Sequence, residues 1–255
     1  STVSQSVLAE NAASAGTSLE VLNKGAQVRM ALLKGDSEQV MVAEMASFAF
    51  VFLFYLAALI FGYQLAYSVI EEKQSRIVEI IAAAIPLRHL LAGKVLGNTI
   101  LAFMQMALYV VVGLVGLSFT EYRSYVTDLT APVLWFLAFF VAGFVALACL
   151  WAVAGALASR TEDVQATGTP LMVLIMGIFF GSLMLDGQGE VIGSFVPPLS
   201  AVAMPKRLMM GDAAWWEALI ALGLLGLFTA GTVWVGERLY RRALMQSGGR
   251  VTLRQ

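Results

Sequence analysis

Charged side chains gather between two long apolar runs, in the segment Glu71 to Gly97, which reads EEKQSRIVEIIAAAIPLRHLLAGKVLG. Within it, Glu72 and Arg76 are spaced for an ion pair along one helix face, and so are Arg76 and Glu79. A charged helix face of this kind can bind a partner surface of complementary charge. A solvated helix whose charges only set the membrane topology would have the same pattern. The residue types allow electrostatic docking, but by themselves they favour the solvated helix, and they leave open whether a partner exists.

Catalytic chemistry has little support in the residues. His89 is the only histidine and Cys149, in an apolar run, is the only cysteine, so neither a disulfide framework nor a cysteine-based zinc site is expected. The motifs G-x-x-x-x-G-K-[ST], G-x-S-x-G and H-E-x-x-H do not occur in the sequence. We predict no catalytic residue, no metal site and no cofactor in this chain, which is therefore not expected to be an enzyme by itself.

Composition places the chain in a membrane. Of its 255 residues, 59% are hydrophobic and 13% are charged, and the mean hydropathy is +0.80. Soluble domains carry about 25% charged residues. The formal net charge of -1 gives no reason to expect nucleic acid as a partner.

Five apolar runs are long enough to cross the hydrocarbon core of a bilayer as helices, since lipid offers no hydrogen-bond partners to other backbone structures. The predicted fold class is an all-α polytopic transmembrane helical bundle. The predicted spans are residues 46–68, 95–118, 132–157, 167–185 and 214–236.

The distribution of basic residues predicts the orientation. Ten lie on one side of the predicted spans: Lys73, Arg76, Arg88, Lys94, Arg160, Arg238, Arg241, Arg242, Arg250 and Arg254. Three lie on the other: Arg123, Lys206 and Arg207. By the positive-inside rule, the segment 70–85 and the tail 238–255 are cytoplasmic, in a multi-pass protein of the cell (inner or plasma) membrane.

The polar stretch 1–40 would then lie outside, with no signal sequence of its own before it. We expect it to be the C-terminal remnant of an external domain, preceded by one further span. Translocation of a short N-terminal tail without help is the alternative. Residues 41–255 form the predicted transmembrane domain.

The segments 71–97 and 195–244 resemble those of type-2 ABC transporter permeases, in particular the sodium-export-like subfamily. In that group a charged helix is followed by small residues, a proline and a Gly-Lys pair entering the next span, as at Pro86, Gly93 and Lys94. The second segment shares a proline-containing outer loop, a Gly-Asp turn, an aromatic pair, a final span and an arginine-rich end. The resemblance covers about residues 41–245.

The resemblance implies a permease half with six spans, of which five are visible here, in the type-2 ABC exporter fold. It implies a cytoplasmic ATPase subunit that holds ATP and Mg²⁺, and a second permease half in a homodimer or heterodimer. The segment 70–85 would be the coupling helix that docks on the ATPase, and the substrate would move outward. The partner-binding residues would be Glu71, Glu72, Lys73, Arg76 and Glu79.

Two other classes remain open: an ion-coupled secondary transporter, and a non-transporting sensor or assembly subunit. Ion coupling usually needs ionisable groups inside the membrane. The spans instead offer polar candidates for the pathway or for helix packing, namely Gln64, Asn98, Gln105 and Glu217. A cation site at the outer mouth, formed by Glu44, Asp186 and Glu217, is a further alternative.

Two further features concern packing. The segment 186–213 is too apolar for a freely solvated loop, so we expect a re-entrant helical hairpin at the outer leaflet, or else a loop packed on the external domain. Gly177 and Gly181 have the G-x-x-x-G spacing that allows helices to approach closely, within one subunit or across a dimer interface.

Overall fold

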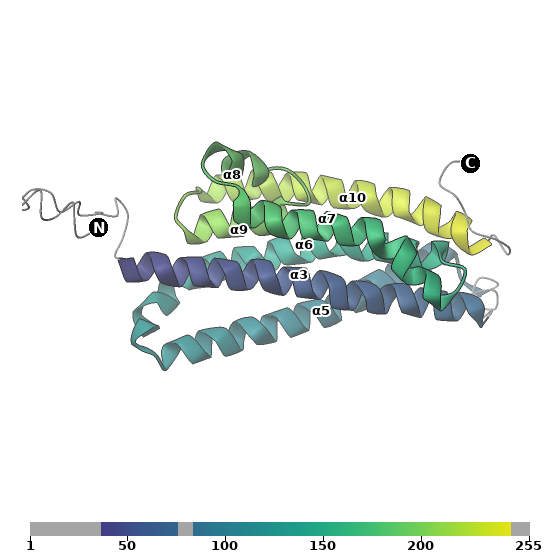
Figure 1. Ribbon diagram of the computed structural model, residues 1–255, viewed down its shortest axis with the longest axis horizontal. Coiled ribbons are helices and arrows are strands. Elements are labelled where there is room, and N and C mark those ends of the chain that lie inside the picture. The colour runs from purple at the N-terminus through teal and green to yellow at the C-terminus, as the bar shows by residue number, and fades with distance from the viewer. Residues whose placement is uncertain (1–36, 76–83, 246–255) are drawn as a thin grey trace, which may run out of the picture. The chain divides into compact units, whose positions relative to one another are not determined.

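The computed structural model describes residues 37–75 and 84–245, and its side chains are described from 40 to 75 and from 84 to 243. These described residues contain helices and no strands. The long helices are α3 (Ser37–Gln74), α5 (Leu87–Ser118), α6 (Val126–Leu157), α7 (Val164–Met184) and α10 (Trp215–Met245) (Figure 1). The short ones are the 3-10 helices η1 (Glu121–Tyr125) and η2 (Thr161–Asp163) and the α-helices α8 (Gln188–Gly193) and α9 (Ser200–Met209).

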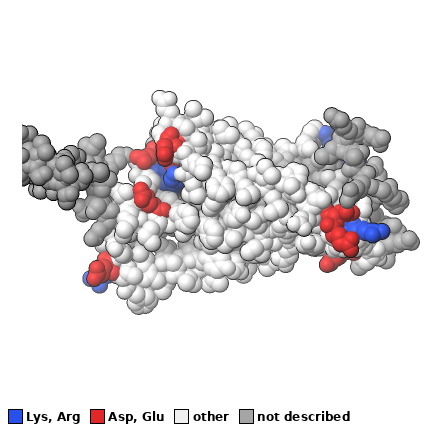
Figure 2. Space-filling model, viewed as in Figure 1, with Lys and Arg blue, Asp and Glu red and all other residues white. Residues whose placement is uncertain are grey.

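All five long helices are long and apolar enough to cross a membrane, and each overlaps one predicted run. The predicted fold class is therefore confirmed. In the view of Figure 2, acidic and basic side chains lie toward the two ends of the bundle and the middle is uncharged. A bilayer requires this distribution, because charge is costly in its hydrocarbon core. The predicted external stretch 1–40 lies almost wholly outside the described residues.

Helix α6 forms the centre of the bundle, where α5, α7, α9 and α10 all pack against it. Its buried aromatic side chains also meet α3. The rings of Phe136 and Phe50 stack with centroids 4.2 Å apart, and those of Phe140 and Phe54 meet edge to face at 5.8 Å. Such pairs contribute beyond their buried area. Helix α6 is thus the element against which the other helices are positioned.

Glycines allow the closest approaches between helices. A Cβ atom on Gly155 of α6 would lie 2.8 Å from the Ala66 Cα of α3 and closer still to its carbonyl oxygen. The indole of Trp151 lies against Gly62 of α3 and Gly168 of α7, where a Cβ atom would also collide with it. These small residues let α3 and α7 lie directly on α6.

The glycine pair with the G-x-x-x-G spacing does not lie at a close contact between described helices. Within the described residues, a Cβ atom on Gly177 would have no heavy atom within 4 Å, and one on Gly181 would meet only Leu199 at ordinary contact distance. The expected close helix approach within the chain at Gly177 is therefore wrong. The helix surface there is exposed.

The segment 186–213 folds as two short helices, α8 and α9, beside the ends at which α3 and α10 begin (Figure 1). We call this region the α9 end, and the opposite one, where α3 stops and α5 begins, the α3/α5 end. Helix α9 packs on α6 and α10 and is almost wholly buried. Gly211, at φ +70°, makes the turn that leads from α9 to α10. The expected helical pair is present, and its entry into the outer leaflet stays a prediction.

Candidate functional site

The last turn of α3 carries the first part of the predicted docking segment. Helix α3 continues without a break from the first span through Gln74, and Ser75 caps its end by donating to the Glu71 carbonyl oxygen at 2.8 Å. The predicted helix over 70–85 is therefore, as far as Gln74, an extension of the span. Arg76 and Glu79 lie outside the described residues, so the pairs expected of Arg76 stay predictions.

Glu72 is engaged inside the bundle. Its Oε1 oxygen lies 2.8 Å from Nζ of Lys94 on α5, and the same Nζ donates to Oγ of Ser68 at 2.6 Å. The Lys94 side chain is only 11% exposed. A cation this deeply buried needs a counter-ion, and Glu72 supplies it. We call Ser68, Glu72 and Lys94 the α3–α5 clamp.

Lys73 is also used within the chain. Its Nζ donates to the carbonyl oxygens of Ala156 at 2.6 Å and Ala158 at 3.1 Å. These carbonyls lie at the C-terminal end of α6, where the last backbone acceptors have no partner in the helix and the helix dipole favours a cation. Of the predicted docking residues that the structure describes, only Glu71 therefore presents an exposed side chain without such a contact.

A second charged cluster lies at the α9 end. Nη1 of Arg207 is 3.0 Å from Oε2 of Glu217 on α10 and donates to Oγ of Ser194 at 2.8 Å. Nη2 of Arg207 donates to the carbonyl oxygen of Asp212 at 2.7 Å. The Arg207 side chain is only 6% exposed. The cluster fastens α9 to α10 and to the segment after α8.

The neighbouring Lys206 contacts α8 and α7, which precede it in the chain. Its Nζ lies 3.1 Å from Oε1 of Glu190 on α8 and donates to the carbonyl oxygen of Ser182 on α7 at 3.2 Å. In the sequence, Lys206 and Arg207 served only to predict the orientation of the protein in the membrane. A pair of cations inside an otherwise apolar segment was the available signal that both have partners close by.

The remaining polar candidates are dispersed. Asn98 is buried and donates from Nδ2 to the Phe61 carbonyl oxygen at 3.1 Å, which ties α5 to α3. Gln64 is exposed on α3, and Gln105 is exposed on α5, where it bonds Tyr109. Glu217 is held by Arg207. The structure thus brings no two of these four residues together.

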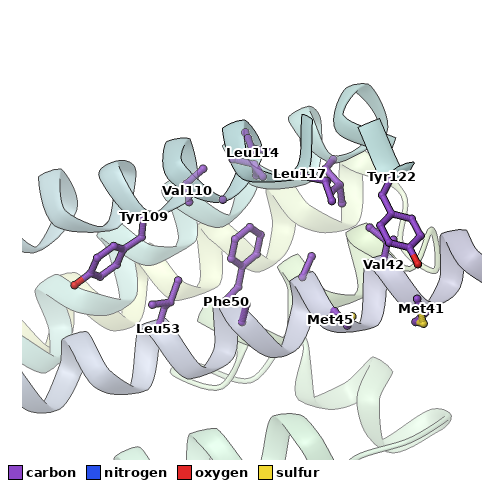
Figure 3. A pocket seen from close by; sticks show the side chains of 15 residues that line it. Met41, Val42, Met45, Phe50, Leu53, Tyr109, Val110, Leu114, Leu117 and Tyr122 are labelled. Atoms are coloured by element: carbon purple, nitrogen blue, oxygen red, sulfur yellow. The ribbon is translucent and has the colours of Figure 1, made fainter. Parts of the chain in front are cut away.

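An apolar groove lies between α3 and α5 on the side toward the α9 end. Figure 3 shows Met45, Phe50, Tyr109, Leu114 and Tyr122 around it, and its cavity is about 300 Å³. A smaller cavity of about 180 Å³ adjoins it along the same two helices and includes Gln105 in its lining. The lining of the larger, apolar groove suits an apolar occupant.

No group of three or more His, Cys, Asp or Glu side chains in the described part of the chain could hold a metal ion. Glu44 and Asp186 are exposed, while Glu217 is paired with Arg207. These three carboxylates therefore form no common cation site in this structure.

Comparison with known proteins identifies the family. The family model described as "ABC-2 family transporter protein" matches residues 1–236. The chain belongs to the ABC-2 transporter family. As expected of an ABC-2 family protein, its described residues form a helical, multi-pass membrane bundle.

Two curated relatives also match this chain of the ABC-2 family. Uncharacterized protein YhaP of Bacillus subtilis (strain 168) is 28% identical over 234 residues, which cover 86% of this chain and 56% of the relative. Uncharacterized protein MJ1024 of Methanocaldococcus jannaschii is 23% identical over 197 residues, or 75% of this chain and 48% of the relative. The chain thus spans about half the length of these relatives. No solved structure matches it.

Proposed function

We propose that this chain is the membrane-spanning permease subunit of an ABC exporter, driven by ATP that a separate ATPase subunit hydrolyses. The observation that carries the proposal is an ABC-2 membrane bundle whose sequence contains no G-x-x-x-x-G-K-[ST] motif. ATP and Mg²⁺ would be bound by the partner, and the chain itself would carry no cofactor. A second permease half would complete the transporter.

The partner would dock at the α3/α5 end, on the segment 71–81. Support comes from Glu71, which is exposed on the last turn of α3, and from the charged residues Arg76 and Glu79 that follow in the sequence. Glu72 and Lys73 would instead transmit the partner's movement, because they bind α5 and α6. The resemblance of residues 71–97 also supports membership of the sodium-export-like subfamily.

The proposal is tested by purifying the complete protein from its native membranes. We expect an ATPase chain with a phosphate-binding loop to copurify, and the complex to hydrolyse ATP. A purified protein that transports without ATP, driven by an ion gradient, would instead support the ion-coupled class. A protein that neither binds an ATPase nor transports would support the sensor or assembly class.

Glu71→Lys should separate docking from folding. The exposed Glu71 has no ion-pair partner among the described residues, so its reversal should leave the unfolding midpoint of the permease unchanged. Like charges brought together across an interface can cost several kcal/mol, so ATPase copurification should fall about tenfold or more. Glu121→Lys reverses an exposed glutamate of η1 and is the matched control. Equal copurification with both variants would show that Glu71 does not take part in docking.

Cysteine labelling tests the orientation. With Cys149 replaced, cysteines at Ser75 and Ser247 should react only with membrane-permeant thiol reagents in intact cells, because the arginine-rich side is cytoplasmic. A cysteine at Ser124, which is exposed in η1, should react with impermeant reagents. Labelling of position 75 from outside would show that the orientation is the reverse, with the proposed docking surface outside the cytoplasm.

A further inference from the structure

Two buried polar atoms at the α3/α5 end have no hydrogen-bond partner among the described residues. They are Oε2 of Glu72 on α3 and the hydroxyl oxygen of Tyr240 on α10. The Tyr240 side chain is 1% exposed. It lies one turn of α10 beyond Gly236, which packs against Val153 of α6, and Glu72 lies next to Lys73, which is bonded to Ala156 near the end of the same helix. The two atoms thus come from different helices and lie in the same region.

Their chemistry is complementary. An ionised carboxylate can only accept hydrogen bonds, and a tyrosine hydroxyl can donate one. A buried polar atom without a partner destabilises the arrangement that leaves it so, and a hydrogen bond to a charged group is among the stronger ones. A small shift that joined Tyr240 to Glu72 would therefore satisfy both atoms.

The surrounding contacts show which helices such a shift would involve. The last turn of α3 is already bonded to α5, through Glu72 and Lys94, and to α6, through Lys73. Among the described residues, no hydrogen bond or ion pair joins this turn to α10. Residues 76–83 follow this turn in the sequence, so a force on them would reach Lys73 and Glu72.

We infer that the α3/α5 end has a second arrangement, in which Tyr240 donates a hydrogen bond to Oε2 of Glu72 while Lys94 keeps Oε1. Tyr240 is then a positioning residue, through which movement of the docked segment is passed to the last span. The inference rests on the proposed function in one respect: nucleotide binding by the partner ATPase is what favours the second arrangement. In that arrangement the one carboxylate of Glu72 would bond to both α5 and α10.

Tyr240→Phe tests the inference, since it removes the hydroxyl and keeps the ring. We assign the described arrangement, in which the hydroxyl has no partner, to the nucleotide-free complex, so loss of the hydroxyl should raise the unfolding midpoint of that complex by about 2–4 °C. The second arrangement would lose its new hydrogen bond. The further rise in midpoint caused by a non-hydrolysable ATP analogue should therefore shrink, and ATP turnover by the complex should fall about tenfold. Tyr67→Phe, at an exposed tyrosine of α3, is the matched control and should change neither quantity.

Each contrary result has a distinct meaning. A lower nucleotide-free midpoint in Tyr240→Phe would show that the hydroxyl already has a partner there, and would overturn the inference. A wild-type response to the analogue and wild-type turnover in Tyr240→Phe would overturn it as well, and would leave the proposed function standing. A wild-type complex with no ATPase and no response to the analogue would overturn the proposed function, and this inference with it.

Discussion

Glu217→Ala should lower the free energy of unfolding by about 3–5 kcal/mol, the usual cost of removing one partner of a buried ion pair. The cost is large because the Arg207 guanidinium, 6% exposed, would remain buried without its counter-ion. It would keep only Ser194 and the Asp212 carbonyl oxygen as acceptors. We expect a lower unfolding midpoint in detergent and faster proteolysis between α8 and α10.

Two comparisons isolate the buried charge. Glu190→Ala removes the partner of Lys206, whose side chain is 20% exposed and can reach water more easily, so we expect a loss of only about 1 kcal/mol. The double variant Arg207→Met with Glu217→Leu should recover most of the lost stability, because no unpaired charge remains. An unchanged midpoint in Glu217→Ala would show that this ion pair contributes nothing to the bundle.

Gly155→Ala should destabilise the bundle by about 1–3 kcal/mol, and Gly155→Val by more. The added Cβ atom would lie 2.8 Å from the Cα of Ala66, and neither backbone can rotate away as a side chain would. Helix α3 would have to move off α6. The α3–α5 clamp and the Lys73 contacts at the end of α3 should loosen with it, so turnover by the proposed ATPase complex should fall together with the unfolding midpoint.

Gly177→Ala is the matched control, because within the described residues nothing lies within 4 Å of its added Cβ atom. It should leave the midpoint within about 0.5 kcal/mol of wild type, or raise it slightly through the better helix propensity of alanine. Equal effects of the two substitutions would show that the contact between Gly155 and Ala66 has no special importance.

The sequence predicts the bundle well because its signal is local. An apolar run that is long enough to cross the bilayer can do so only as a helix, and all five predicted runs are helices here. Helix ends are harder to predict. Nothing in the residues around Glu71 shows that α3 would continue past the span to Gln74, since a surface helix and an extended span have the same charge pattern.

The contacts at the two ends of the bundle depend on tertiary structure. Local spacing suggests Arg76 as the partner of Glu72, but the structure pairs it with Lys94, a choice that only the crossing of α3 and α5 determines. Arg207 and Glu217 meet because the turn at Gly211 reverses the chain. A glycine motif likewise does not reveal which helix it faces, which is why close packing at Gly177 within the chain was a wrong prediction, while the dimer interface stays a prediction.

Trp151 can serve as an intrinsic fluorescent probe of this protein. Among its five tryptophans, Trp151 is fully buried against Gly62 and Gly168, whereas Trp215, Trp216 and Trp234 are more than half exposed on the bundle surface. Its indole therefore has a surrounding of protein atoms alone, and quenchers dissolved in water or attached to lipid chains will reach the other emitters first. The fluorescence that survives such quenching reports the junction of α3, α6 and α7 without any label.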